Sequence, residues 1–205
     1  MKRVTLALFI GIFVLFLTHS ASANSVSLTI EYVQQDHYYF SINGSSTFST
    51  MMCDSFDNHI YLGESWTATK SPFLAGIANG LFGPSLVLDY KAAGLIYKSM
   101  LSGKLTTLQA QWAIWGLFSS NARNDHDFLT YGGAATDSFY LLYAQIASKS
   151  AYSGLVLYTP LNGKPGCGPQ EFIGYSAVPE PSSLMLLGTG LIGLAGAVRR
   201  KLAKA

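Results

Sequence analysis

The sequence predicts an α+β protein: one domain over residues 24–177 with a β-rich sheet or sandwich and an inserted helical segment, followed by a C-terminal transmembrane helix. Three observations predict this fold class. Segments with a two-residue apolar period lie at both ends of the domain, segments with helical periodicity lie between them, and an apolar run lies near the C-terminus. A domain of about 155 residues is long enough to bury one hydrophobic core.

The first strands are indicated by alternation and by one turn signal. Residues 26–30 alternate apolar and polar side chains, which is typical of a half-buried strand. Residues 37–42 and 46–53 flank Asn43-Gly44, the dipeptide preferred where both residues of a hairpin turn need positive φ. Residues 60–69 predict a further strand.

The centre of the domain has helical spacing. Residues 85–101 predict a helix that ends near Gly103, and Thr106 with Gln109 forms a capping box that opens a second helix running to about residue 118. A third helix begins near Thr136, and its apolar residues are Phe139, Leu142, Tyr143 and Ile146. The C-terminal segments 154–159 and 171–176 return to strand patterns.

The charge distribution excludes one large class of function. The chain has 205 residues and a formal net charge of +2, but many of its basic residues lie at the two ends. Between residues 24 and 178, seven Lys and Arg stand against ten Asp and Glu, a balance of −3. A nucleic-acid-binding domain needs a basic face, so we expect no nucleic-acid partner.

The N-terminus has the features of a secretory signal. Lys2 and Arg3 precede an apolar run over residues 4–17, and Ala21-Ser22-Ala23 supplies small residues at cleavage spacing. The pattern predicts a signal peptide over residues 1–23, removed after Ala23, with an uncleaved anchor as the alternative. The expected partners at this end are the general export machinery and signal peptidase.

The C-terminus carries three features in a fixed order. Val178-Pro179-Glu180-Pro181 is followed by an apolar, Gly-rich run predicted as a transmembrane helix over about 183–198, and Arg199-Arg200-Lys201 then opens a basic end over 199–205 that would stop transfer. This trio resembles the PEP-CTERM sorting tail of Gram-negative bacteria. The resemblance implies an exosortase as processing partner and anchoring in the inner membrane in transit. It also implies a final place at the cell surface or in the extracellular matrix.

A buried amide and a cysteine form the candidate site. At about 100° per residue, Gln111 shares an apolar helix arc with Trp112 and Trp115. A buried amide without a partner costs about 1–3 kcal/mol. Two interpretations satisfy it: a hydrogen bond to strand backbone, or an internal thioester in which the Gln111 carbonyl carbon is bonded to the sulfur of Cys53, with ammonia lost.

These residues resemble bacterial thioester domains of surface adhesins. Cys53 matches the thioester cysteine, Gln111 the thioester glutamine and Ile114-Trp115 the aliphatic–Trp pair, while segments 92–97 and 170–174 are similar to thioester-domain-like PEP-CTERM proteins. The resemblance implies a covalent adhesion module that captures an amine, a hydroxyl or a polysaccharide. The residues expected to shield the bond from water are Trp112, Ile114 and Trp115.

A disulfide competes with the thioester for the same sulfur. Cys53 and Cys167 are the two cysteines of the chain, and an even number in an exported domain favours pairing. The bond would close a loop of 114 residues (167 − 53) and stabilise the fold by roughly 2–4 kcal/mol. A passive structural protein of an exopolysaccharide or biofilm matrix would then result. A reduced, unlinked pair is the third alternative.

Other clusters predict no catalysis. Asn124-Asp125-His126-Asp127 lacks the glycine and the distal glutamate of a calcium loop, and zinc usually requires more His or Cys. We therefore expect no metal, no cofactor and no enzymatic turnover. The sequence predicts an exosortase-sorted surface or matrix protein that acts by binding or by structure.

Overall fold

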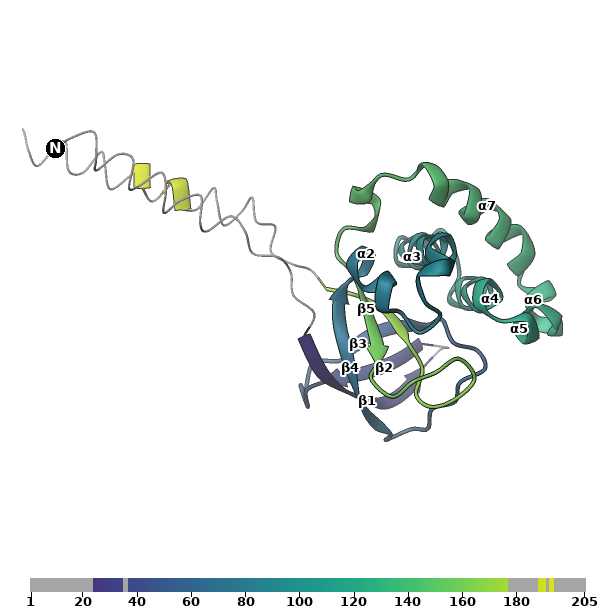
Figure 1. Ribbon diagram of the computed structural model, residues 1–205, viewed down its shortest axis with the longest axis horizontal. Coiled ribbons are helices and arrows are strands. Elements are labelled where there is room, and N and C mark those ends of the chain that lie inside the picture. Colours follow the sequence, from purple (N-terminus) through teal and green to yellow (C-terminus); the bar gives the residue numbers. More distant parts are fainter. Residues whose placement is uncertain (1–23, 35–36, 177–187, 191, 194–205) are drawn as a thin grey trace, which may run out of the picture. The chain divides into compact units, whose positions relative to one another are not determined.

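The computed structural model describes residues 24–34, 37–176, 188–190 and 192–193 (Figure 1). The chain divides into two compact units, residues 1–175 and 176–205. The described part of the second unit is residue 176 and residues 188–190 and 192–193, of which the last two segments are helical.

Six antiparallel strands of the first unit form a closed barrel in the order β1-β2-β3-β6-β5-β4. The strands are β1 Asn24–Gln34, β2 His37–Ile42, β3 Ser49–Cys53, β4 Ser65–Pro72, β5 Leu155–Pro160 and β6 Phe172–Tyr175. The α+β class is confirmed, but the sheet is a barrel and not an open sheet or sandwich. The long β1 closes it, since this strand pairs with β2 along one side and with β4 along the other.

Local signals account for the first hairpin. Asn43 has a φ of 53° and Gly44 a φ of 69°, the positive values that a two-residue hairpin turn requires. The Asn43 carboxamide oxygen also accepts a hydrogen bond from the Ser27 N–H at 2.8 Å, which ties the turn to β1. The predicted turn is present and β2 pairs with β3, but β3 begins at Ser49, opposite Phe40, so the connection is longer than the two-residue hairpin that was predicted.

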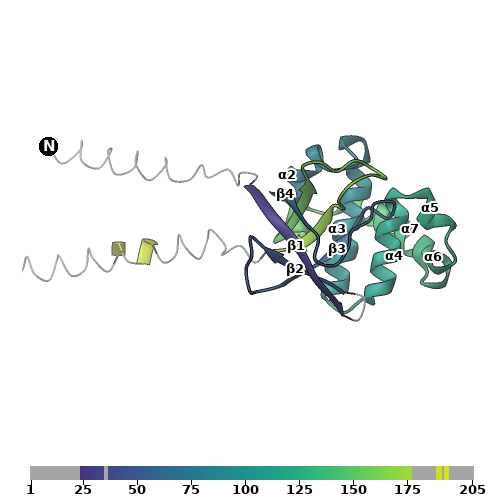
Figure 2. The ribbon, with the colours of Figure 1, turned by 90° about the horizontal axis from the view of Figure 1, so that it is seen from below.

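The helices lie between β4 and β5 in the chain and on one side of the barrel (Figures 1 and 2). They are α2 Phe73–Gly76, α3 Val87–Leu101, α4 Thr107–Phe118, α5 Ser120–Asn124, α6 His126–Thr130 and α7 Gly133–Ile146. Short 3-10 helices cover Ile77–Asn79, Pro84–Leu86 and Lys149–Tyr152. The predicted capping box is confirmed at the start of α4, where Thr106 and Gln109 bond to each other's backbone N–H.

Strand alternation divides the core into two clusters. Met51 and Cys53 point into the barrel, where they pack with Phe40, Trp66 and other barrel residues. Met52, between them, points outward and packs with residues of α3 and α4. A small barrel filled by side chains is a packed core and not a pore. The end of β3 therefore lies between the barrel core and the helical layer.

The predicted strand 60–69 begins late. Its first residues form a turn in which Gly63 has a φ of 80° and the Glu64 carboxylate accepts a hydrogen bond from the Tyr61 N–H at 2.9 Å. Tyr61 and Leu62 are exposed as a result. A positive φ is incompatible with a continuous strand, so β4 starts at Ser65.

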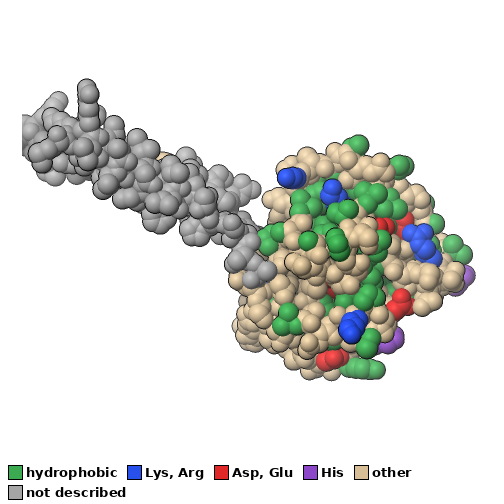
Figure 3. Space-filling view, viewed as in Figure 1, with side chains coloured by type: hydrophobic (Ala, Val, Ile, Leu, Met, Phe, Trp, Pro, Cys, Tyr) green, Lys and Arg blue, Asp and Glu red, His purple; other side chains and the backbone are tan. Residues whose placement is uncertain are grey.

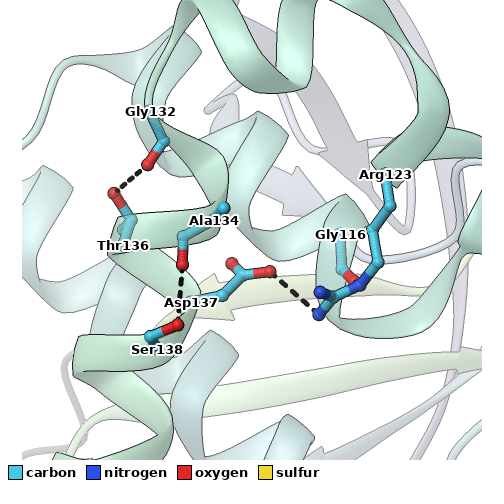
Figure 4. A network of polar contacts seen from close by, with 7 residues as sticks. All are labelled: Gly116, Arg123, Gly132, Ala134, Thr136, Asp137 and Ser138. Atoms are coloured by element: carbon cyan, nitrogen blue, oxygen red, sulfur yellow. Dashed lines mark hydrogen bonds and ion pairs between the residues drawn. The ribbon is translucent and has the colours of Figure 1, made fainter.

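An ion pair between exposed Arg123 and buried Asp137 ties α5 to its neighbours (Figure 4). Arg123 donates to the Asp137 carboxylate at 3.1 Å and to the Gly116 carbonyl oxygen at 2.5 Å, and so joins α7 to α4. Asp137 is buried, and this burial raises its pKa to about 7, although the Arg123 charge acts in the opposite direction. The contact fixes the end of the helical layer at the cost of burying a carboxyl group.

Several predictions lie outside the described residues. They concern the signal peptide over 1–23 with its cleavage residues Ala21 and Ala23, the motif at 178–181 and the basic end at 199–205. The predicted transmembrane segment 183–198 is described only at 188–190 and 192–193. Within the described ranges, no helix is long and apolar enough to cross a membrane.

Candidate functional site

Gln111 and Cys53 lie in direct contact. The Gln111 carboxamide nitrogen donates to the Cys53 carbonyl oxygen at 2.6 Å, and its oxygen accepts from the Cys53 N–H at 3.4 Å. Both residues are buried. The amide is thus satisfied by strand backbone, the first of the two interpretations of its burial, and the same contact holds its carbonyl carbon beside the cysteine.

Strand geometry explains why Cys53 accepts this partner. The pairing of β2 with β3 ends at Tyr38 and Met51, whereas β6 continues to pair as far as Cys53 with Phe172. The next residue, Asp54, donates its N–H toward β6, so the N–H and carbonyl of Cys53 face the other side. Among the described strands that side has no ladder partner at Cys53. The carboxamide from α4 occupies it.

The thiol of Cys53 is held neutral. Complete burial, with a smaller contribution from the neighbouring Asp54 carboxyl, raises the pKa of Cys53 to about 12. The sulfur accepts a hydrogen bond from the Ser55 N–H at 3.3 Å, and the Ser55 hydroxyl lies 3.7 Å from it. The Trp115 indole N–H lowers the pKa of this thiol but forms no hydrogen bond of good geometry.

Aromatic rings cover the outer side of this contact. Trp112 and Trp115 meet edge to face with centroids 5.1 Å apart, and Phe56 contacts both rings at 5.7 and 5.2 Å. Two of the three expected shielding residues thus belong to one aromatic group. Ile114 packs instead in the helical cluster with Met52, on the opposite side of α4.

A buried pair of carboxyl groups lies beside the site, and the sequence analysis missed it. Glu171 accepts hydrogen bonds from Tyr90 at 2.5 Å, from the Leu81 N–H at 3.0 Å and from the Thr159 hydroxyl. Neither carboxyl oxygen of Asp54 has a hydrogen-bond partner of good geometry. Burial, followed by the charge of Glu171, raises the pKa of Asp54 well above its usual range. Asp54 therefore lacks the hydrogen-bond donors that stabilise the Glu171 carboxylate.

A pocket of about 430 Å³ opens next to the aromatic group. Its lining residues are Tyr38, Phe56, Asp57, Asn58, His59, Ile60, Trp115, Asn121 and Gln170. Trp115 lines the pocket and also influences the Cys53 thiol, so this residue connects the pocket to the site. Asp57 accepts a hydrogen bond from Asn121 at 2.8 Å, and no Lys or Arg lines the wall.

Gln170 is a second buried carboxamide near the cysteine. It lies in the segment just before β6, and its side chain bonds to the segment that follows Cys53. Its nitrogen donates to the Ser55 carbonyl at 3.2 Å and to the Asn58 carbonyl at 2.6 Å. The segment 170–174 indicated a strand, but the contacts of this amide with Ser55 and Asn58 depend on pairing between distant parts of the chain.

Both cysteines are free thiols in the structure, Cys53 buried and Cys167 exposed. Cys167 lies in a turn closed by two backbone hydrogen bonds with Lys164 at 2.9 Å. The Asn58 side chain holds the same turn, since it donates to the Lys164 and Gly168 carbonyls and accepts from the Gly166 N–H. The disulfide remains a prediction, and its formation requires this turn to move.

The described residues contain no cluster of three or more His, Cys, Asp or Glu that could hold a metal. Within the segment 124–127, Asp125 caps α6 through its side chain, which accepts the Asp127 N–H at 2.9 Å. A helix cap accounts for that acidic residue.

The fold and the C-terminal segment define a barrel-and-helix domain joined to a sorting signal. Residues 177–201 match the family described as the PEP-CTERM protein-sorting motif. The match supports an exported protein that is an exosortase substrate, placed at the cell surface or outside the cell. No curated protein and no solved structure matches the chain.

Proposed function

We propose that the exported domain is a covalent adhesion module in which Cys53 and Gln111 form an internal thioester. The observation that carries the proposal is the pair of hydrogen bonds that holds the Gln111 carboxamide against Cys53. A thioester needs a cysteine and a glutamine on different elements held in contact by the fold. The end of β3 and the middle of α4 meet this requirement.

The proposed reaction is balanced without a cofactor. The Cys53 sulfur attacks the Gln111 carbonyl carbon, the carbon–nitrogen bond breaks, and ammonia leaves with the two amide hydrogens and the thiol proton. A nucleophile on a partner, either a primary amine or a hydroxyl, later attacks the same carbon. An amide or ester then forms at Gln111, and Cys53 regains its proton as a thiol.

The pocket supports a route for that nucleophile. Trp115 lines the pocket and also influences the Cys53 thiol, so we infer that an acceptor in the pocket reaches the thioester by displacing this indole. Asp57 and His59 in the wall are groups that could accept a proton from the attacking amine or hydroxyl. The aromatic cover over the bond keeps water out until the pocket is filled.

Intact mass of the exported chain, with and without methylamine, tests the proposal. We expect the mass to be low by one ammonia, and methylamine to add to the chain. Cys53→Ala and Gln111→Ala should each abolish both effects. Gln170→Ala is the matched control, because it removes a second buried carboxamide near Ser55. A wild-type chain that has its full mass and does not react with methylamine would overturn the thioester proposal. Loss of the deficit in Gln170→Ala alone would reassign the acyl donor to Gln170.

A passive structural role is the second candidate, and one observation favours it. The Gln111 amide already has two hydrogen-bond partners, so its burial needs no covalent bond. In this role the domain would be a matrix component stabilised by a Cys53–Cys167 disulfide. A mass deficit of two hydrogens, restored by a reductant and lost in Cys167→Ser, would establish this alternative.

A further inference from the structure

Helix α7 has two apolar faces, and the barrel and helices cover only one of them. Its inner face packs on α3 and α4 through buried Tyr140 and Ala144. Its outer face lies away from the barrel (Figure 1). Phe139, Leu142, Tyr143 and Ile146 lie on that outer face, and we call these four residues the α7 stripe.

The α7 stripe is continuous and strongly exposed. Phe139 is 62% exposed, Leu142 67%, Tyr143 42% and Ile146 82%. Their spacing of three, four and seven residues places them along one side of the helix, and the Phe139 and Tyr143 rings lie 6.3 Å apart. Hydrophobic side chains follow the rim of the molecule at the position of α7 (Figure 3). The apolar residues whose spacing predicted this helix are therefore exposed to solvent and not buried in the core.

The size of the stripe is that of an interface. At roughly 200 Å² for each fully exposed side chain, the exposed fractions amount to about 500 Å² per copy. The largest apolar patch of a typical monomer covers about 300–600 Å² and is often functional. Two such surfaces bury about 1,000 Å² together, near the lower limit for a specific protein–protein interface.

The stripe also carries no charge. Asp137 is the only charged residue of α7, and it is buried against Arg123 on the inner side. An uncharged face has nothing to attract a charged partner, but it pairs with itself without repulsion. In a two-fold interface both subunits use the same patch, so that if one residue contacts a second residue of the partner, the second also contacts the first.

We propose that the α7 stripe is the interface of a homodimer, in which α7 packs antiparallel on α7 of a second copy of this chain. The stripe is symmetric about the point between Leu142 and Tyr143. A two-fold axis there places Phe139 against Ile146 of the partner subunit, and Leu142 against Tyr143 of the partner subunit. Large side chains then meet large side chains along about two turns of helix.

Sedimentation of the exported chain tests the dimer. We expect twice the mass of one chain at micromolar concentration, and at least a tenfold higher dissociation constant in Leu142→Glu and Ile146→Glu. Leu62→Glu is the matched control, because Leu62 is 65% exposed but lies in the loop before β4. It should remain dimeric. Circular dichroism should show that all three variants keep the wild-type fold.

A cross-link provides a second measurement that does not depend on disruption. In a Cys167→Ser background, Leu142→Cys should form a disulfide-linked dimer under mild oxidation, whereas Leu62→Cys should not. A wild-type chain that sediments as a single copy at about 100 μM would overturn the proposal. So would a dimer that survives both α7 substitutions. A monomer whose α7 is protected from hydrogen exchange only while residues 177–205 are present would assign the stripe to the chain's own tail and would also overturn it.

Discussion

Replacement of Gln111 by methionine isolates the contact that defines the candidate site. Methionine has a similar length and a similar helix propensity but no hydrogen-bonding amide. The measurement belongs in a Cys53→Ala background, because alanine keeps the N–H and carbonyl of residue 53 while it excludes both a thioester and a disulfide. Any loss of stability then reports the hydrogen bonds alone.

The magnitude follows from the two distances. The Cys53 carbonyl loses a donor at 2.6 Å, and the N–H loses an acceptor at 3.4 Å, with both groups buried. A buried polar group left without a partner costs about 1–3 kcal/mol. Because the longer contact contributes little, we expect the free energy of unfolding to fall by about 2–3 kcal/mol. This corresponds to a shift of roughly 1 M in the urea midpoint.

Urea unfolding monitored by tryptophan fluorescence measures this shift. Gln145→Met in the same background is the control, because Gln145 is an exposed residue of α7 and its replacement should change stability by less than about 0.5 kcal/mol. If Gln111→Met is as mild as the control, the carboxamide does not replace a strand partner at Cys53. The physical basis for placing Gln111 at the site would then be wrong.

Three further predictions concern other buried groups of the domain. Burial raises the pKa of Asp137 to about 7, so its stabilising contribution is complete below its unfolded pKa near 4 and is lost as pH rises through about 7. Asp137→Asn should remove about 2–4 kcal/mol of this pH dependence in urea titrations between pH 4 and 8. An unchanged pH profile would contradict the assignment. Glu171→Gln should lower the free energy of unfolding by about 1–3 kcal/mol at pH 7, because an amide cannot accept hydrogen bonds from all three donors. Asp54→Asn should be tolerated, so thermal unfolding should give a lower midpoint for Glu171→Gln than for Asp54→Asn. Gly94→Ala should cost about 1–3 kcal/mol in chemical denaturation, since its Cβ would lie 2.6 Å from Phe73, while a neutral result would show that α3 can move away from α2.

The features that the sequence predicts best are those set by neighbouring residues. Asn43-Gly44 determines its turn through backbone conformation, and Thr106 with Gln109 determines a helix start through side chains three residues apart. The strand predicted from residue 60 begins only at Ser65, because Gly63 has a positive φ that a continuous strand cannot contain. Local chemistry thus predicted which elements exist more reliably than where they begin.

The surroundings of Cys53 were predicted only in part because they depend on pairing across long stretches of chain. The contact with Gln111 was an expectation from an amide on an apolar arc, and the structure brings the two residues together. The carboxyl pair of Asp54 and Glu171 left no such signal, since isolated acidic residues usually lie in solvent. Only the register between β3 and β6 makes them neighbours.

The chain order couples the candidate site to the sorting motif. Cys53 pairs with Phe172 on the last strand, and the buried Glu171 and Gln170 directly precede that strand. β6 also closes the barrel between β3 and β5. The matched motif begins at residue 177, two residues after β6 ends at Tyr175. In export from the N-terminus, the cysteine is therefore enclosed only when the segment beside the sorting motif has crossed the membrane. A chain that stops before residue 170 would lack both the closed site and the motif, so an unfinished domain would not be sorted with an exposed Cys53.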